Sequence, residues 1–460
     1  MSNSGNQQFS TKEADTLLKP WERPQAIIQF ELEQLREEGC QIDSTLIERI
    51  EAARSLNDEP ALDQLMAELS ESGPSADYLF DEPEDLAAIQ AARPSGPRQL
   101  EMSPETDVLD RIYGAWLGRA AGCVLGKPIE KWPKDTIAAY LEYYDALPLD
   151  NYIPTGKGFP ENHQSHYKYS GVDCARDHIT CMPRDDDMDY TVVGLLVLEN
   201  YGIDFTAQEV GLTWLDRLPY NLLYTAERIA YRNLVNAVQP PATARMKNPF
   251  REWIGAQIRA DIWGYIMPGR PERAAELAFR DACISHTKNG IYGAMFIAAL
   301  LAASYVVSET EQLVEIALSE IPANCRLASG IRDTVLWSKE DADWEQTWQK
   351  INLHYGHYAD VHTIKNALLV VLGLLQGGGD FEQTIVTTVQ GGWDTDCTTA
   401  SAGSVMGLIL GAKALPEKWV GVFNDEIQSA VRGEQSNRLT TLAKRTHTIA
   451  ADVLAAKVKT

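Results

Sequence analysis

The chain has 460 residues, a net charge of −24 and a hydrophobic fraction of 45%. This length suits about two or three domains, or one large domain with an appendage, and the apolar content is ordinary for a globular protein. The acidic balance argues against a broad nucleic-acid-binding face and against attachment to an anionic membrane surface, because both need gathered lysine and arginine side chains.

The sequence carries no recognisable targeting or membrane-spanning signal. Its N-terminus lacks a basic stretch followed by an apolar one, and no run approaches the roughly 18 apolar residues of a membrane helix. The seven cysteines are scattered, and no pair has the C-x2-C spacing of zinc sites. We therefore expect a cytoplasmic protein with reduced thiols.

Residues 1–100 differ in composition from the rest, with 20 acidic and 8 basic side chains. Apolar residues recur at helical spacing over 27–50 and 62–69, and the Pro- and Gly-containing segment 93–97 is typical of a linker. We predict an acidic helical extension over 1–100 that packs on the main body or binds a partner. Its role stays open.

Two predicted helices carry glycine at every fourth position. The first begins at Asp107 and runs to about residue 126, and the second covers residues 400–412. Each glycine costs up to ~1 kcal/mol of helix propensity relative to alanine, so such a helix needs a neighbouring backbone close by. We predict that the two helices pack backbone to backbone, through Gly114, Gly118, Gly122 and Gly126 on one and Gly403, Gly407 and Gly411 on the other.

The segment 148–183 shows no sustained periodicity and is rich in proline, glycine, histidine and tyrosine. Long loops inside compact domains are usually functional or disordered, and the aromatic content favours an ordered lid near a ligand. Its histidines have no regular ligand spacing, so they predict no zinc site. The residues concerned are Tyr152, His163, His166, Tyr167, Tyr169 and His178.

The remaining segments are mostly helical, and none shows a convincing alternating strand pattern. The fold class is therefore all-α, with a main domain over 105–456. Helices are expected within 192–198, 205–235, 251–264, 272–306, 311–319, 340–350 and 363–376.

Two acidic segments each lead into a small or apolar helix. Asp185–Asp187 precede the first, and Asp394 and Asp396 follow Gly391-Gly392-Trp393 at the start of the second. A single Asp there has an ordinary explanation, since it caps exposed N–H groups. Adjacent carboxylates at a buried helix need a counter-charge, however, because like charges 4 Å apart repel by up to ~4 kcal/mol at an effective dielectric of 20.

The two acidic segments together predict a site for hard cations. Asp186, Asp187, Asp394 and Asp396 carry four negative charges, which two divalent ions would neutralise. Oxygen ligands of this kind suit Mg²⁺, Mn²⁺ or Ca²⁺ rather than zinc.

Several motifs occur in the order found in one known family. They are the glycine-rich helix that ends before Glu130, the run Asp185–Asp187, Ser285-His286-Thr287, Asp380-Phe381-Glu382, Gly-Gly-Trp-Asp-Thr-Asp at 391–396 and Pro416-Glu417-Lys418-Trp419. From about residue 107 to 454 the chain resembles the ADP-ribosylglycohydrolase family. The resemblance implies an all-α fold with a two-metal centre, usually of Mg²⁺ or Mn²⁺, in a cleft.

The resemblance also implies roles for individual residues. By position, the metal ligands would be Asp185, Asp186, Asp187, Asp394, Asp396 and Thr398. The predicted catalytic carboxylates are Glu130, Asp187 and Asp394, although Glu130 by itself would be an ordinary loop residue. The predicted substrate contacts are Tyr152, His286, Asn366 and Trp393.

The chain departs from the family pattern at several positions. Asp185 stands where a Thr usually begins the first motif, so the frame is open by one residue and Asp189 is a lesser candidate. Trp393 is inserted in the second motif, Cys397 replaces its last Thr, and Cys123 stands where an Asp is common. Both carboxylate groups remain, and the identity of the substrate stays open.

The sequence thus predicts a metal-dependent enzyme that hydrolyses an N- or O-glycosidic bond to ribose and releases ADP-ribose or a related group from a modified protein or metabolite. The ions would hold vicinal ribose hydroxyls and a water, and Glu130 would transfer the proton. One alternative is a non-catalytic relative that binds a nucleotide-like ligand. Another is a hydrolase of a different ribosyl metabolite.

Overall fold

The computed structural model describes residues 19–159 and 171–456. Its internal contacts divide the chain into two compact units, Met1–Leu79 with Arg245–Phe250 and Phe80–Ala244 with Arg251–Thr460. The sequence-based division at residue 100 stays a prediction.

The first unit contains three of the described helices: α2 (Pro24–Glu37), α3 (Ser44–Leu56) and α4 (Glu59–Leu69). The side chains of Asp43 and Asp58 accept hydrogen bonds from the backbone N–H groups of Thr45 and Ala61, so each caps the N-terminus of a helix. Apolar side chains at helical spacing are buried between the helices, as the amphipathic pattern predicts. They include Ile28, Leu32, Ile50, Leu62 and Leu69.

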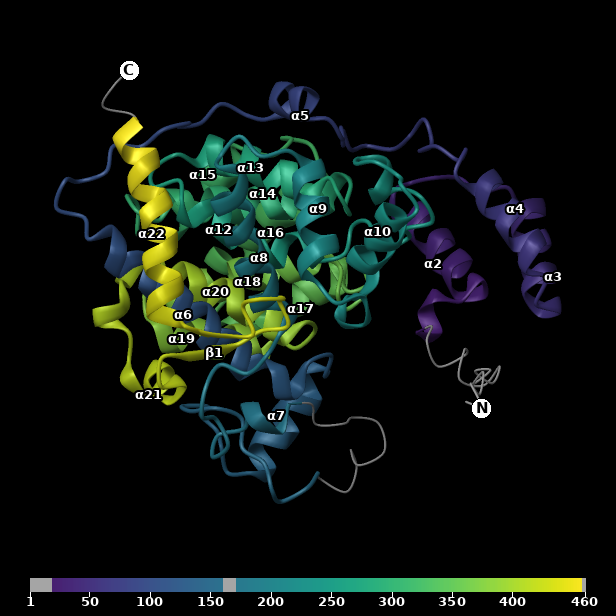
Figure 1. The fold of residues 1–460 in the computed structure, drawn as a ribbon. Helices are drawn as coiled ribbons and strands as arrows, with labels where there is room; N and C mark the ends of the chain where they lie inside the picture. Colours follow the sequence, from purple (N-terminus) through teal and green to yellow (C-terminus); the bar gives the residue numbers. More distant parts are fainter. Residues whose placement is uncertain (1–18, 160–170, 457–460) are drawn as a thin grey trace, which may run out of the picture. The chain divides into compact units, whose positions relative to one another are not determined.

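The second unit is a helical body (Figure 1), and the all-α fold class is confirmed. Its helices are α5 (Leu86–Ala92), α6 (Val108–Gly126), α7 (Lys134–Tyr143), α8 (Asp186–Tyr201), α9 (Ala207–Arg217), α10 (Thr225–Val235), α11 (Gly255–Ile258), α12 (Asp261–Tyr265), α13 (Pro271–Ala282), α14 (Lys288–Ala303), α15 (Thr310–Leu318), α16 (Arg326–Glu340), α17 (Trp344–Tyr355), α18 (Thr363–Gly377), α19 (Phe381–Gln390), α20 (Thr395–Leu410), α21 (Glu417–Val420) and α22 (Leu439–Ala456). Short 3₁₀ turns link several of them.

Helices α6 and α20 pack with their backbones in contact, as the glycine pattern predicts. A methyl group added at Gly118 would lie 2.1 Å from the carbonyl oxygen of Gly403, and one added at Gly114 would lie 2.2 Å from that of Gly407. Both helices are buried along nearly their whole length. Their close contact fixes the end of α6 beside the start of α20, where Thr395 Oγ1 donates a hydrogen bond to Gly126 O at 2.8 Å.

The predicted linker 93–97 is anchored within the second unit. Arg93 pairs with Glu320 at 2.6 Å and also with Glu272 on α13. Arg98 pairs with Glu320 at 3.0 Å. Because Glu320 is buried, these two arginines supply the positive charge that a carboxylate in such a place needs.

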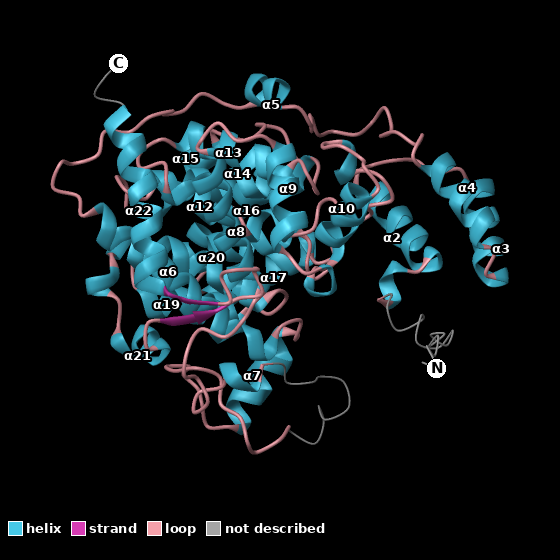
Figure 2. Cartoon of the chain, in the orientation of Figure 1, coloured by secondary structure: helices cyan, strands magenta, loops and turns pink. Residues whose placement is uncertain are grey.

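The strand content is a small difference from the sequence analysis. Residues Glu426–Gln428 and Ser436–Arg438 form an antiparallel pair, β1 and β2 (Figure 2). Strands of three residues are too short to show a period of two, which is why no alternation was visible.

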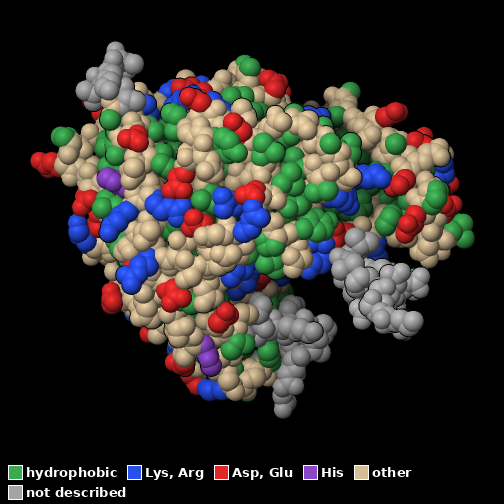
Figure 3. Space-filling model, viewed as in Figure 1, with side chains coloured by type: hydrophobic (Ala, Val, Ile, Leu, Met, Phe, Trp, Pro, Cys, Tyr) green, Lys and Arg blue, Asp and Glu red, His purple; other side chains and the backbone are tan. Residues whose placement is uncertain are grey.

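No described helix is both long and apolar enough to cross a membrane. Among the described residues on the face shown in Figure 3, lysine and arginine side chains are scattered among aspartate and glutamate.

Candidate metal centre

The first acidic segment lies at the N-terminus of α8. Asp185 is the N-cap residue, and its Oδ1 accepts a hydrogen bond from the backbone N–H of Asp187 at 3.0 Å. Asp186 and Asp187 then form the first turn of a helix whose following residues are apolar and buried, so the carboxylates are drawn inward with it. Asp185 and Asp187 are buried and Asp186 is partly buried.

The second acidic segment lies at the N-terminus of α20. Gly392 and Trp393 both have positive φ, at 78° and 63°, and this sharp turn brings the chain into the helix. Asp394 is the N-cap residue, but its carboxylate caps none of the described N–H groups of the first turn. Capping therefore does not explain this side chain, which leaves its oxygens available for another partner.

The structure brings the two acidic segments together. One ligand atom each from Asp187, Asp396 and Cys397 lie within 4.8 Å of one another, and so do those from Glu130, Asp394 and Asp396. Asp396 thus belongs to both groups. We call Glu130, Asp185, Asp186, Asp187, Asp394 and Asp396 the carboxylate cluster.

Two cations that the sequence analysis missed lie in this cluster. Lys127 Nζ is 2.5 Å from Asp185 Oδ2 and 3.4 Å from Asp396 Oδ2. Arg119, which is fully buried in α6, pairs with Asp187 at 3.0 Å and with Asp261 at 2.9 Å. The sequence did contain a sign of both residues, because each is a charged side chain within or directly after a glycine-rich apolar helix. A charge placed there needs a buried partner.

The cluster carries more negative charge than these cations offset. Burial, and then the nearby carboxylate of Asp185, raise the pKa of Asp186 to about 8. Burial and Glu130 raise the pKa of Asp396 to about 6. Burial would also raise the pKa of Asp185, but the ammonium of Lys127 holds it below its ordinary value.

A divalent cation fits the residues present. Asp396 Oδ1 is buried and accepts no hydrogen bond from the described donors. Its neighbours Glu130 and Asp394 offer further carboxylate oxygens within 4.8 Å, which are the ligands that Mg²⁺ and Mn²⁺ prefer. The thiols of Cys123 and Cys397 border the cluster, and burial raises the pKa of both, so they are neutral and weak ligands.

Metal removal is expected to make the stability of the protein depend on pH. Because the pKa values of Asp186 and Asp396 are raised in the folded state, their contribution to stability is present below about pH 4 and is lost as the pH rises through 6 and 8. The melting temperature of EDTA-treated protein should therefore fall from pH 5 to pH 8. Mn²⁺ at about 100 times its dissociation constant should restore about 2.7 kcal/mol at pH 8.

Differential scanning calorimetry at several pH values tests this expectation. Asp186→Asn should flatten part of the decline, because that carboxylate has the higher of the two pKa values. A melting temperature that depends neither on pH in this range nor on added Mn²⁺ would contradict it.

Thr398 lies beside the cluster but has its hydroxyl engaged. Its Oγ1 donates to the backbone oxygen of Asp394 at 2.9 Å, one helical turn earlier. Asn366 is also fully buried, and its Oδ1 accepts from the backbone N–H of Asp394 at 3.3 Å. Both side chains hold the segment that carries Asp394, and their predicted roles as metal ligand and substrate contact stay predictions.

Trp393 lines a pocket beside the cluster. Its ring stacks on that of Trp348, with centroids 5.6 Å apart, and Lys365 Nζ lies 4.8 Å from its centroid. The pocket has a volume of about 250 Å³. It is lined by Trp132, Pro133, Lys134, Asp135, Trp348, Asn352, Asp360 and Trp393, of which Trp132 comes two residues after Glu130 and Trp393 directly precedes Asp394.

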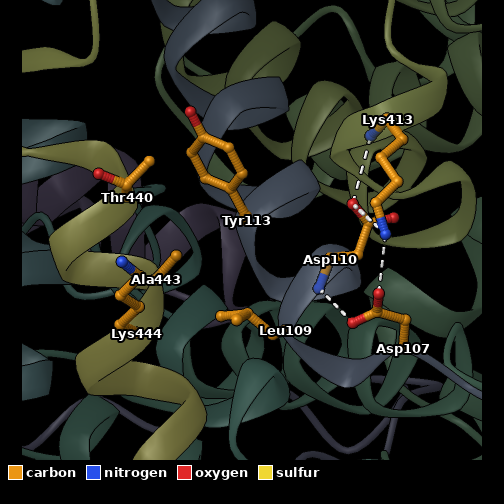
Figure 4. A pocket seen from close by; sticks show the side chains of 8 residues that line it. All are labelled: Asp107, Leu109, Asp110, Tyr113, Lys413, Thr440, Ala443 and Lys444. Atoms are coloured by element: carbon orange, nitrogen blue, oxygen red, sulfur yellow. Dashed lines mark hydrogen bonds and ion pairs between the residues drawn. The ribbon is translucent and has the colours of Figure 1, made fainter.

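A second pocket, of about 200 Å³, contains none of the predicted site residues (Figure 4). At its edge Lys413 pairs with Asp107 at 2.9 Å and with Asp110 at 3.7 Å. Leu109 and Tyr113 of α6 line it together with residues of α22. The pocket next to Trp393 is therefore the better candidate for substrate.

The structure does not bring Tyr152 and His286 to the cluster. Tyr152 is 1% exposed and its hydroxyl donates to the backbone oxygen of Trp419. His286 is fully buried, and its Nδ1 lies 2.8 Å from Ser285 Oγ. Their contacts are those of core residues, and their roles toward a substrate stay predictions.

Part of the predicted lid is described. Tyr140 of α7 and Tyr144, the residue directly after that helix, donate hydrogen bonds to the backbone oxygens of Pro154 and Gly158, at 2.8 and 3.0 Å, and so hold this stretch against the helix. His163, His166, Tyr167 and Tyr169 lie outside the described residues.

The second unit is thus an all-α body with a buried carboxylate cluster at the ends of three helical segments. A family model for ADP-ribosylglycohydrolase matches residues 104–452, which is most of the chain. The chain belongs to the ADP-ribosylglycohydrolase family, and the resemblance drawn from its motifs is confirmed.

Two individual proteins are similar to the chain at low sequence identity. An uncharacterized protein of Archaeoglobus fulgidus is 25% identical over 209 residues, which make up 41% of this chain and 62% of that protein. The match thus spans less than two thirds of that relative's length. A solved structure described as an ADP-ribosylglycohydrolase-related protein complex covers 75% of this chain and 99% of its own, with 19% identity and a TM-score of 0.48.

Proposed function

We propose that this protein is a divalent-metal-dependent hydrolase of an N- or O-glycosidic bond to ribose, which releases ADP-ribose or a related ribosyl group from a modified protein or metabolite. The observation that carries the proposal is the meeting of Asp187, Asp394 and Asp396 in one buried cluster with Glu130 at its more exposed side. The family membership supports the same class of substrate.

The cluster would hold the metal through Asp394 and Asp396, with Glu130 next to them and Asp187 on the other side of Asp396. A bound divalent ion supplies a Lewis acid that attracts ribose hydroxyls and makes a nearby water more acidic. The two ions of the sequence analysis, as Mg²⁺ or Mn²⁺, stay a prediction.

Glu130 is placed to move a proton. Its side chain is 23% exposed, whereas those of Asp394 and Asp396 are buried, so it is the carboxylate that an entering water would meet. Lys131 Nζ lies 2.9 Å from its Oε1 and Lys127 Nζ lies 3.8 Å from its Oε2, so a cation stands beside each of its oxygens. Proton transfer by a positioned carboxylate contributes about 10²–10⁴-fold to a rate.

The pocket beside Trp393 would bind the part of the substrate that does not react. The stacked rings of Trp348 and Trp393 offer an aromatic surface for a base or the face of a sugar. Lys134 lines the same pocket and pairs with Glu345 at 2.7 Å, and Lys365 over the Trp393 ring pairs with Asp360 at 2.8 Å, so either lysine would exchange its carboxylate partner to bind an anionic diphosphate.

A panel of substrates tests the proposal. Proteins ADP-ribosylated on arginine or serine and small O- and N-ribosides would be incubated with Mg²⁺ or Mn²⁺, and the released ADP-ribose or ribose measured by chromatography. Release that needs the metal is expected. The proposal fails if no member of the panel is hydrolysed with either ion.

Glu130→Gln is expected to lower kcat about 10²-fold or more, since the amide cannot accept the proton. Steady-state kinetics on the best substrate of the panel would measure it. Glu142→Gln, on the exposed face of α7, is the matched control and should leave kcat unchanged. Equal kcat for Glu130→Gln and the control would remove Glu130 from the reaction.

Two features favour a second candidate, a relative that binds a nucleotide-like ligand without cleaving it. The ammonium of Lys127 lies inside the cluster, and Cys123 and Cys397 border it with neutral thiols. Thermal stabilisation by ADP-ribose without turnover of the panel would support this candidate.

A further inference from the structure

The position of Lys127 bears on how many metal ions the centre holds. Its Nζ lies 2.5 Å from Asp185 Oδ2, 3.4 Å from Asp396 Oδ2 and 3.8 Å from Glu130 Oε2. These three carboxylates come from three separate parts of the chain: Glu130 follows the 3₁₀ turn after α6, and the other two lie at the N-termini of α8 and α20. One ammonium thus joins the two acidic segments in the way a bridging metal ion would.

We propose that the ammonium of Lys127 is a built-in cation that takes the place of one of two divalent ions, so that this chain holds a single ion at Asp394 and Asp396, on the side where Glu130 lies. The inference rests on the proposed function, because it concerns the same centre.

The backbone fixes Lys127 at this place. The residue directly follows α6, and its N–H donates to the carbonyl oxygen of Cys123. The preceding Gly126 lies so close to the first turn of α20 that an added methyl group would be 2.2 Å from Thr395 O. With its Cα held beside α20, the lysine side chain reaches the carboxylates of both acidic segments.

The charges on the two sides of Asp396 are distributed unequally. On one side, of the aspartates 185 to 187, Asp185 pairs with Lys127 and Asp187 with the fully buried Arg119. On the other side Asp394 lies close to Glu130, whose described cationic partners are Lys127 at 3.8 Å and the more exposed Lys131 at 2.9 Å. A divalent ion is attracted to the second side and repelled by the ammonium on the first.

The thiols agree with this division. Cys123 belongs to a group with Asp185 and Asp187 that could hold a metal, but it offers a buried thiol in place of a carboxylate. Each of the two groups that include Asp187 thus offers two carboxylates and a thiol, whereas the group of Glu130, Asp394 and Asp396 offers three carboxylates, the harder ligand set for Mg²⁺ or Mn²⁺.

Counting the bound ions tests the proposal. The full chain would be treated with EDTA, dialysed and titrated with MnCl₂ by calorimetry, and the loaded protein examined by electron paramagnetic resonance. The natural chain is expected to bind about one Mn²⁺ with the spectrum of an isolated ion. Lys127→Met, which keeps the length of the side chain and removes its charge, is expected to bind about two with the spectrum of a coupled pair.

Two further variants isolate the charge of Lys127. Lys127→Arg keeps a cation and should bind about one ion, and Lys131→Met, which alters the neighbouring lysine, should also bind about one. Folding of each variant would be checked by circular dichroism. If Lys127→Met does not fold, the numbers of Mn²⁺ ions bound by the natural chain and by Lys127→Arg decide whether the centre holds one ion or two.

The possible counts separate this inference from the proposed function. Two ions in the natural chain, or one ion in folded Lys127→Met, would overturn the inference and leave metal-dependent hydrolysis standing. No bound ion in the natural chain would overturn both. The expected counts together with a panel of substrates that is not hydrolysed would support the inference and overturn the hydrolase.

Discussion

Replacing Asp396 by asparagine is expected to lower kcat/KM on the order of 10³-fold, the largest loss of activity expected from a single carboxylate. Asp396 is the residue shared by the group with Asp187 and the group with Glu130 and Asp394. Its Oδ1 is buried and accepts no hydrogen bond from the described donors, so a metal ion is the partner that would justify the burial of its charge. Removing one preorganised electrostatic contact from an active site lowers kcat about 10²–10³-fold, and we expect the loss of a metal ligand to lower it at least as much.

The metal affinity of the Asp396→Asn variant should fall together with its activity. Because asparagine has nearly the same shape and relieves repulsion among carboxylates, the metal-free variant should be at least as stable as the natural chain in EDTA. Asp380→Asn is the control, since Asp380 is an exposed N-cap of α19 and asparagine caps helices equally well. Full activity and unchanged Mn²⁺ affinity in Asp396→Asn would refute the metal centre.

The packing of α6 on α20 could be predicted because its signal is local. Glycine at every fourth position places the missing side chains on one face of a helix, and two such helices have matching faces. The all-α class follows in the same way from helical periodicity along the chain. The strand pair at Glu426–Gln428 and Ser436–Arg438 could not be predicted, because three residues carry no period.

The carboxylate cluster was predictable in its members but not in its internal pairing. Asp187 and Asp396 are recognisable as charges at the mouths of buried helices. Cys397 Sγ lies 3.2 Å from Asp187 Oδ2. This contact depends on how α8 and α20 pack in space, and neither segment's sequence alone predicts it. The same holds for Lys127, whose partners are 58 and 269 positions away along the chain.

Residue type alone does not tell whether a buried side chain contacts a substrate or only its neighbours in the core. In the sequence, a buried histidine or tyrosine whose polar atom is hydrogen-bonded to a neighbouring residue cannot be told from one that faces a ligand. His286 and Tyr152 have core partners, Ser285 and the backbone of Trp419. Trp393 differs because its turn with positive φ places the ring in a pocket.

Gly118→Ala is expected to destabilise the protein by about 3 kcal/mol or more. In an exposed helix the same change would stabilise by up to about 1 kcal/mol, because alanine has the higher helix propensity. At Gly118, however, the new methyl group would lie 2.1 Å from the backbone oxygen of Gly403, which no side-chain rotation can relieve. Overpacking of a core costs about 1–3 kcal/mol when side chains can adjust, and two backbones in contact adjust less.

The Gly118→Ala variant should also lose metal affinity. Helix α6 leads to Lys127 and Glu130, whereas α20 begins at Thr395. Separating the two helices would therefore move Glu130 away from the carboxylates of α20. Urea unfolding and Mn²⁺ titration would measure the two effects. Gly73→Ala is the matched control, since nothing lies within 4 Å of the added carbon there, and its stability should be unchanged or slightly higher. If Gly118→Ala were as stable as that control, the close contact of α6 with α20 would not be what holds the two acidic segments together.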